Sequence, residues 1–140
     1  MKTTALFWDA SAIVPLLIEE ECSPVICKLW SDGLVPHAWE WAFVEVDAAL
    51  TRRGANSAIW QDWRNIQLSF RLYSFPGDDL RSLRMMNRTL GLRAADAGHI
   101  FLFHSLVHEI QGLQLITFDK EMVTAAQQLS LPLHPACIQS

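Results

Sequence analysis

The chain has 140 residues and a mass of 15.9 kDa, which is the size of one compact domain. Hydrophobic residues make up 51% of the sequence and charged residues only 19%, a balance that excludes a disordered or low-complexity chain. The formal net charge of −4 excludes a uniformly basic protein that wraps nucleic acid. We therefore expect a single domain over residues 1–140.

Features of secreted, zinc-binding or membrane proteins are not expected. Cys22, Cys27 and Cys137 form no C-x-x-C pair, and any disulfide pairing would leave one of them over. Asp9 interrupts the apolar run at the N-terminus too early for a signal peptide. Residues 122–140 carry no charge, but glutamines, serines and two prolines break the stretch, so no membrane span is expected. These features favour a reducing, cytoplasmic location.

In the first half of the chain, the pattern predicts strand, helix, helix, strand, helix and helix over residues 3–8, 11–21, 23–30, 34–37, 38–53 and 56–72. Ser11 and Ser23 are plausible N-caps of the first two helices. Gly54 is a stop signal for the long helix before it.

In the second half, a turn or short strand is followed by helix, helix, strand, helix and strand over residues 73–77, 78–90, 94–111, 113–118, 120–129 and 131–135. The helix over 94–111 is apolar nearly all round, which predicts that it is buried. Short strands separated by helices indicate an α/β fold with a parallel sheet.

Four acidic residues stand out against this outline. Asp9 and Asp119 each follow one of the two clearest strands directly, and ligand sites of parallel sheets gather beyond the carboxyl ends of the strands. Asp96 lies near the start of the most apolar helix, and Glu45 is flanked by apolar residues in AFVEVDAAL. Capping, compensation of a helix dipole or a solvated face could account for each acid alone.

Taken together, these four carboxylates would repel one another if they met without a cation. The usual remedy is Mg²⁺ or Mn²⁺, which prefer oxygen ligands and can activate a water molecule for attack on a phosphoryl group. No cluster of His and Cys residues offers a competing metal site.

Four segments, WDASAIVPLL, VEVDAAL, LRAADAGHIFLF and LITFDKEMVTAAQQLSLPL, carry a resemblance to a known family. In this order and spacing the chain resembles PIN-domain ribonucleases, of the kind found as the VapC toxin of type II toxin–antitoxin pairs. The resemblance implies a three-layer α/β/α sandwich around a small parallel sheet. It also implies a Mg²⁺- or Mn²⁺-dependent endoribonuclease that cleaves RNA and is held in check by a cognate antitoxin protein.

The same resemblance implies roles for particular residues. The family's acids fall on Asp9, Glu45, Asp96 and Asp119, which would share the metal ion, and Asp9 and Asp96 would be the best direct ligands. Its small hydroxyl residues fall on Ser11 and Thr117, which would hydrogen-bond the carboxylates or a metal-bound water.

Two other functions stay open at this point. One is a small α/β phospho-acceptor or phosphatase domain with Asp9 as the nucleophile, although Lys120 is the only lysine of the second half and follows Asp119 directly. The other is an inactive PIN-like module that only binds.

His99, three residues after Asp96, is either a donor to the site or a core histidine, whereas Asp47 is expected to point away from the site. His104 and His108 have zinc-ligand spacing but no completing residue.

Tryptophans and arginines are candidates for contacts with partners. Trp39 and Trp41 cannot both face inward from one helix, and Trp60 and Trp63 pair at i,i+3, so part of this set could meet an antitoxin helix or a second subunit. All eight arginines lie between residues 52 and 93, which gives residues 48–93 a net charge of +5. Either they keep helices soluble, or some of them hold the RNA backbone beside the acids, the candidates being Arg52, Arg53, Arg81, Arg84 and Arg88.

Overall fold

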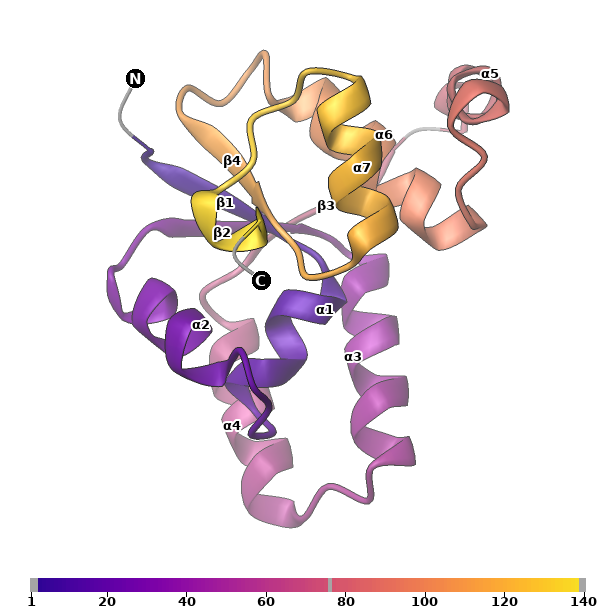
Figure 1. The fold of residues 1–140 in the computed structure, drawn as a ribbon. Helices are drawn as coiled ribbons and strands as arrows, with labels where there is room; N and C mark the ends of the chain where they lie inside the picture. The colour runs from indigo at the N-terminus through magenta and orange to yellow at the C-terminus, as the bar shows by residue number, and fades with distance from the viewer. Residues whose placement is uncertain (1–2, 76, 139–140) are drawn as a thin grey trace.

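A parallel sheet lies at the centre of the computed structural model, which describes residues 3–75 and 77–138. Its strands are β1 (Ala5–Trp8), β2 (Val35–Trp39), β3 (Arg71–Tyr73) and β4 (Leu113–Ile116), in the order β3-β2-β1-β4 (Figure 1). All four residues of β1 are buried, as expected of a strand that is covered on both faces.

Helices cover both faces of the sheet (Figure 1). One face carries α1 (Ala10–Ile13) with its 3₁₀ continuation η1 (Val14–Leu16), α2 (Ser23–Ser31), α3 (Trp41–Arg52) and α4 (Ser57–Gln67). The other carries α6 (Ala94–Leu106) and α7 (Lys120–Gln128), with α5 (Asp79–Leu90) packed beside α6. The fold is therefore a three-layer α/β/α sandwich, which confirms the predicted fold class.

Two hydrophobic cores result from the alternation of side chains along β1. Leu6 and Trp8 point into the core on the α1–α4 face, together with Leu50 and Trp63. Ala5 and Phe7 point into the opposite core beside the buried face of α6, which confirms that this apolar helix is internal. Within the described residues, no helix combines the length and the apolar character needed to cross a membrane.

The beginning of the chain differs from prediction in its capping. The first helix starts at Ala10 with Asp9 at the N-cap position, so Ser11 is not a cap, and helical structure ends at Leu16 rather than at residue 21. Ser23 does not cap α2 either. Its hydroxyl donates to the Pro15 carbonyl at 2.8 Å and accepts from the Glu20 N–H at 2.8 Å, so it holds together the loop between η1 and α2.

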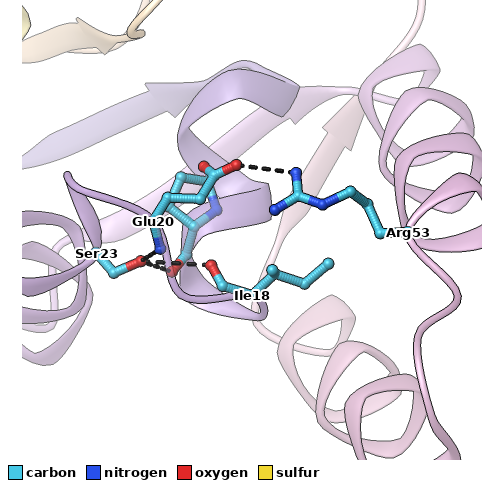
Figure 2. A network of polar contacts seen from close by, with 5 residues as sticks. Ile18, Glu20, Ser23 and Arg53 are labelled. Atoms are coloured by element: carbon cyan, nitrogen blue, oxygen red, sulfur yellow. Dashed lines mark hydrogen bonds and ion pairs between the residues drawn. The ribbon is translucent and has the colours of Figure 1, made fainter.

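The same loop is tied to the end of α3. The Arg53 guanidinium lies 3.2 Å from the Glu20 carboxylate, and Figure 2 shows this ion pair beside the Ser23 contacts. Residues 19–21, predicted as the end of the first helix, therefore belong to a loop in which Glu20 is paired.

Other predicted boundaries were wrong because strand pairing overrides local helical pattern. Ala38 and Trp39 belong to β2, where they pair with Leu72 and Tyr73 of β3, and the long helix begins only at Trp41. The helix predicted over 56–72 ends at Gln67 for the same reason.

The C-terminal half follows the prediction more closely. α5 and α7 match within one residue at each end. The helix predicted over 94–111 ends at Leu106, and the chain then turns through Gly112, whose φ of 76° a side chain would disfavour, into β4. The predicted last strand is a single bridge between Leu115 and Leu133, followed by the 3₁₀ helix η2 (Pro135–Ile138).

Candidate acidic site

Asp9 and Asp119 lie at the same edge of the sheet, as the sequence predicted. β1 and β4 are adjacent and parallel, with Trp8 opposite Ile116, so the residues that follow the two strands leave the sheet together. The Asp9 N–H donates to the Ile116 carbonyl at 3.4 Å. The Asp9 side chain turns inward, since only 5% of the residue is exposed.

Two hydroxyl groups connect the loops that carry these acids. Ser11 Oγ donates to Asp9 Oδ1 at 2.8 Å and accepts from the Phe118 N–H at 2.9 Å. It also lies 3.2 Å from Thr117 Oγ1, which accepts from the Asp119 N–H at 3.1 Å. Ser11 is thus in direct contact with a candidate carboxylate, and Thr117 is linked to it through Ser11.

The Asp119 carboxylate is the N-cap of α7. Its Oδ1 atom accepts from the N–H groups of Glu121 and Met122 at 2.9 and 3.1 Å. Both bonds use Oδ1, so Oδ2 has no hydrogen-bond partner among residues 3–75 and 77–138. Asp119 Oδ1 can therefore cap α7 while Oδ2 takes part in the candidate site.

The remaining acids come from helices on opposite faces of the sheet, Glu45 from α3 and Asp96 from the first turn of α6. His99, one turn after Asp96, joins them: its Nε2 atom lies 2.6 Å from Glu45 Oε1. Only 1% of His99 is exposed, and the side chain of Glu45 is 31% exposed. His99 is therefore both a buried histidine and a partner of a candidate site residue.

The pKa values show that these groups form one electrostatic cluster. Burial raises the pKa of Asp9 to about 6, a rise that the negative charge of Glu45 reinforces and that His99 and the hydroxyl groups of Ser11 and Thr117 oppose. The pKa of Asp96 is also raised, first by burial and then by the charge of Asp119, with a smaller contribution from Glu45. Such a cluster favours either bound protons or a bound cation.

The four acids suit a hard divalent cation by their chemistry, because all of them offer carboxylate oxygens. As the side chains stand, no three His, Cys, Asp or Glu residues in the described part of the chain are arranged to hold a metal ion. Asp9 and Glu45 are instead held by Ser11 and His99. The donor set fits Mg²⁺ or Mn²⁺, and the carboxylates would have to turn toward the ion to bind it.

One part of the site had no signal in the sequence, the packing of Trp39 against α6. A Cβ atom added to Gly98 would lie 2.5 Å from Trp39 Cη2, so the glycine allows the indole to approach the helix. The edge of His99 meets the Trp39 ring at a centroid distance of 5.0 Å. His99 Nδ1 is buried, and no group within residues 3–75 and 77–138 forms a hydrogen bond with it. The spacing of His99 from Asp96 did signal a contact with the site, but which acid it meets depends on tertiary structure.

Other sequence candidates lie outside the cluster. Asp47 accepts a hydrogen bond from Trp63 Nε1 at 2.7 Å, which confirms that it points away. The rings of His104 and His108 meet at 5.8 Å, and the part of the chain that the structure describes supplies no third ligand. Arg52 and Arg53 lie at the end of α3, two helical turns beyond Glu45, and so away from the acids.

The tryptophans fall into three groups by their exposure. Trp8 and Trp63 are buried core residues, and Trp30, Trp39 and Trp60 are partly buried. Trp41 is 46% exposed, which leaves it available for a contact with another molecule.

No protein-family model and no curated protein matches the chain. Among solved structures, the fold is similar to the crystal structure of PAE2754 from Pyrobaculum aerophilum. The TM-score is 0.62 at 21% sequence identity, and the match covers 89% of this chain and 87% of the other. At this identity the similarity establishes the shared α/β architecture.

Proposed function

We propose that the chain is a Mg²⁺- or Mn²⁺-dependent endoribonuclease of the PIN type, acting in the cytoplasm as the toxin of a toxin–antitoxin pair. The observation that carries this proposal is electrostatic: the charge of Glu45 acts on Asp9, the charges of Asp119 and Glu45 act on Asp96, and the pKa values of Asp9 and Asp96 are both raised. Raised pKa values mean that burial and neighbouring acids disfavour the negative charge of these carboxylates, and a bound cation would relieve that cost.

In this proposal each residue has a defined task. Asp9 and Asp96 bind the ion directly, and Glu45 and Asp119 complete its surroundings directly or through water. The ion, when bound, would lower the pKa of a water molecule, and its positive charge would also stabilise negative charge on the phosphodiester. Ser11 orients Asp9, and Asp119 offers the oxygen that does not cap α7.

Cleavage assays with matched variants test the proposal. Wild-type protein with Mn²⁺ should cleave labelled RNA, and EDTA, Asp9→Asn or Asp96→Asn should reduce the rate at least 100-fold. Asp47→Asn is the control, because Asp47 is a carboxylate of the same helix as Glu45 but contacts Trp63. Full activity of Asp9→Asn would contradict the mechanism.

Two further outcomes would favour the other functions. A carboxylate labelled by acetyl phosphate would favour a phospho-acceptor or phosphatase that uses Asp9. The burial of Asp9 and its bond to Ser11 weigh against such a nucleophile. RNA binding without cleavage in Mn²⁺ would favour an inactive binding module.

The proposal also includes a homodimer and an antitoxin as protein partners. Exposed apolar side chains on β3 and α5 support such contacts, namely Leu72, Leu80 and Met85. α5 has no buried residue within the described chain, which is unusual for a helix that carries leucines and methionines. Sedimentation of wild-type protein and of Leu80→Lys tests the dimer, and a monomer of unchanged mass in both would contradict it.

A further inference from the structure

Beside the acids lies a group of aromatic rings that the proposed chemistry does not use. The Trp39 ring contacts Trp41 at a centroid distance of 6.1 Å and an interplanar angle of 30°. It also stacks on Phe75 at 5.4 Å and 27°. Trp39 thus lies between Phe75, on which it stacks, and Trp41, to which it is tilted by 30°, and Trp41 is 46% exposed.

The inner ring of this group is held rigidly. The Trp39 and His99 rings meet edge to face, and the far end of the indole lies 2.5 Å from the position that a Cβ atom of Gly98 would take. Packing on all these partners fixes the Trp39 plane, and Trp41 rests on it. A partly exposed ring held in a fixed orientation loses little conformational freedom when a flat ligand stacks on it.

The position of Trp41 relates it to the candidate catalytic acids. It begins α3, and Glu45 follows exactly one i,i+4 step later, so the two side chains are neighbours on one face of the helix. The rise between them is about 6 Å, four steps of 1.5 Å. A nucleic acid with a phosphate at the acids would therefore bring an adjacent base within reach of the indole.

We propose that Trp41, supported by Trp39, is a stacking site for an unpaired nucleobase next to the scissile phosphate. The inference rests on the proposed ribonuclease function. It adds to that function a contact between the protein and a base of the RNA. An aromatic face can bind a base by stacking, without a positive charge. This suits Trp41, whose neighbours are the exposed apolar Val44 and the acidic cluster. The same exposed ring could instead meet a protein, and the experiment separates the two.

The test measures binding of a labelled ten-nucleotide oligouridine by fluorescence anisotropy, with Asp96→Asn in every protein to prevent cleavage. Adding Trp41→Ala should raise the Kd about 5- to 150-fold, and Trp41→Phe should raise it less than Trp41→Ala does. Trp60→Ala is the matched control, since Trp60 is a partly buried indole on α4, and it should leave the Kd within twofold. Equal melting temperatures show that the variants are folded.

Oligonucleotides with a single abasic position sharpen the assignment. At one position of the oligonucleotide, removal of the base should raise the Kd for the protein that keeps Trp41. The same removal should leave the Kd for Trp41→Ala unchanged. Equal abasic effects in both proteins at every position, or an unchanged Kd for Trp41→Ala, would overturn the stacking site. Loss of self-association in Trp41→Ala with unchanged Kd would assign the ring to a protein interface.

The outcome is separable from that of the proposed function. If wild-type protein cleaves RNA and loses activity in Asp9→Asn while Trp41→Ala binds normally, the ribonuclease proposal stands and the stacking site fails. If wild-type protein neither binds nor cleaves RNA, both are overturned.

Discussion

His99 Nε2 lies 2.6 Å from Glu45 Oε1, and this contact connects a helix on one face of the sheet to a helix on the other. His99 is 1% exposed, whereas the Glu45 side chain is 31% exposed. The partly exposed Glu45 carboxylate is therefore held in place by the buried His99 ring. This contact restricts the direction of the second Glu45 oxygen.

A double-mutant cycle with His99→Leu and Glu45→Gln should give an interaction energy of about 1–2 kcal/mol. This value is low for a hydrogen bond to a charged group, because water can reach Glu45 and replace part of the lost contact. The free energies of unfolding are measured in urea with EDTA present. His99→Gln, which keeps a side-chain N–H donor, should lose less stability than His99→Leu. Strictly additive single effects would show that the contact contributes nothing.

The buried Asp9 should make the metal-free protein less stable as the pH rises. Its pKa is about 6 in the folded protein against 3.8 for an ordinary aspartate, so the folded state holds a proton that the unfolded state releases between pH 4 and 6. Stability should fall across this window by up to about 3 kcal/mol, which corresponds to two pKa units.

Asp9→Asn removes this titration and serves as the comparison in EDTA. The variant should lack the decline between pH 4 and 6 and be more stable than wild type at pH 7, as measured by urea unfolding. Mn²⁺ should stabilise wild type at pH 7 and have little effect on the variant, because only binding to the folded state adds stability. A parallel pH dependence in both proteins would disprove the assignment of the decline to Asp9.

Gly98→Ala should destabilise the protein by about 1–3 kcal/mol through overpacking, although alanine normally favours a helix. The added Cβ atom would stand 2.5 Å from two atoms of the Trp39 ring. The loss should shrink in a Trp39→Leu background, where that contact is absent. Gly77→Ala is the control, since no other described residue that is not its chain neighbour lies within 4 Å of its added Cβ, and its melting temperature should barely change.

Charge reversal on α5 tests whether its arginines hold RNA. Arg81, Arg84 and Arg88 are exposed and recur at helical spacing, and three residues separate the end of α5 from the start of α6, which carries Asp96. Arg84→Glu with Arg88→Glu should weaken RNA binding and reduce the slope of log K against log salt by about 1.4, or 0.7 per contact. Arg52→Glu with Arg64→Glu makes the same change of net charge on α3 and α4. An equal effect of both pairs would mean that only overall charge matters.

The strand and helix pattern was sufficient to predict an α/β fold with a parallel sheet and the place of Asp9 and Asp119 at one edge of it, whereas the three layers were implied by the family resemblance. Both acids follow apolar strands, and parallel strands end at one edge, so no distant contact had to be known. The boundaries failed where a distant strand decides local structure. Ala38 and Trp39 continue a helical pattern, but pairing with β3 holds them in β2.

The detailed contacts of the site were beyond a reading of one sequence. Ser11 resembles an N-cap, and only its approach to Phe118 and Thr117, more than a hundred residues later, shows that it joins two loops. The pairing of His99 with Glu45 depends likewise on how α3 and α6 are placed about the sheet.

The strand order has a consequence for synthesis of the protein on the ribosome. β1 is made first, yet it lies between β2 and β4, and Ala5 pairs with Leu113. A nascent chain lacks that neighbour, and also Thr117 and Asp119, until more than a hundred further residues have been made. The acidic site can therefore be completed only after residue 119 has emerged, and a chain that terminates before it would carry Asp9 without the residues that complete its surroundings.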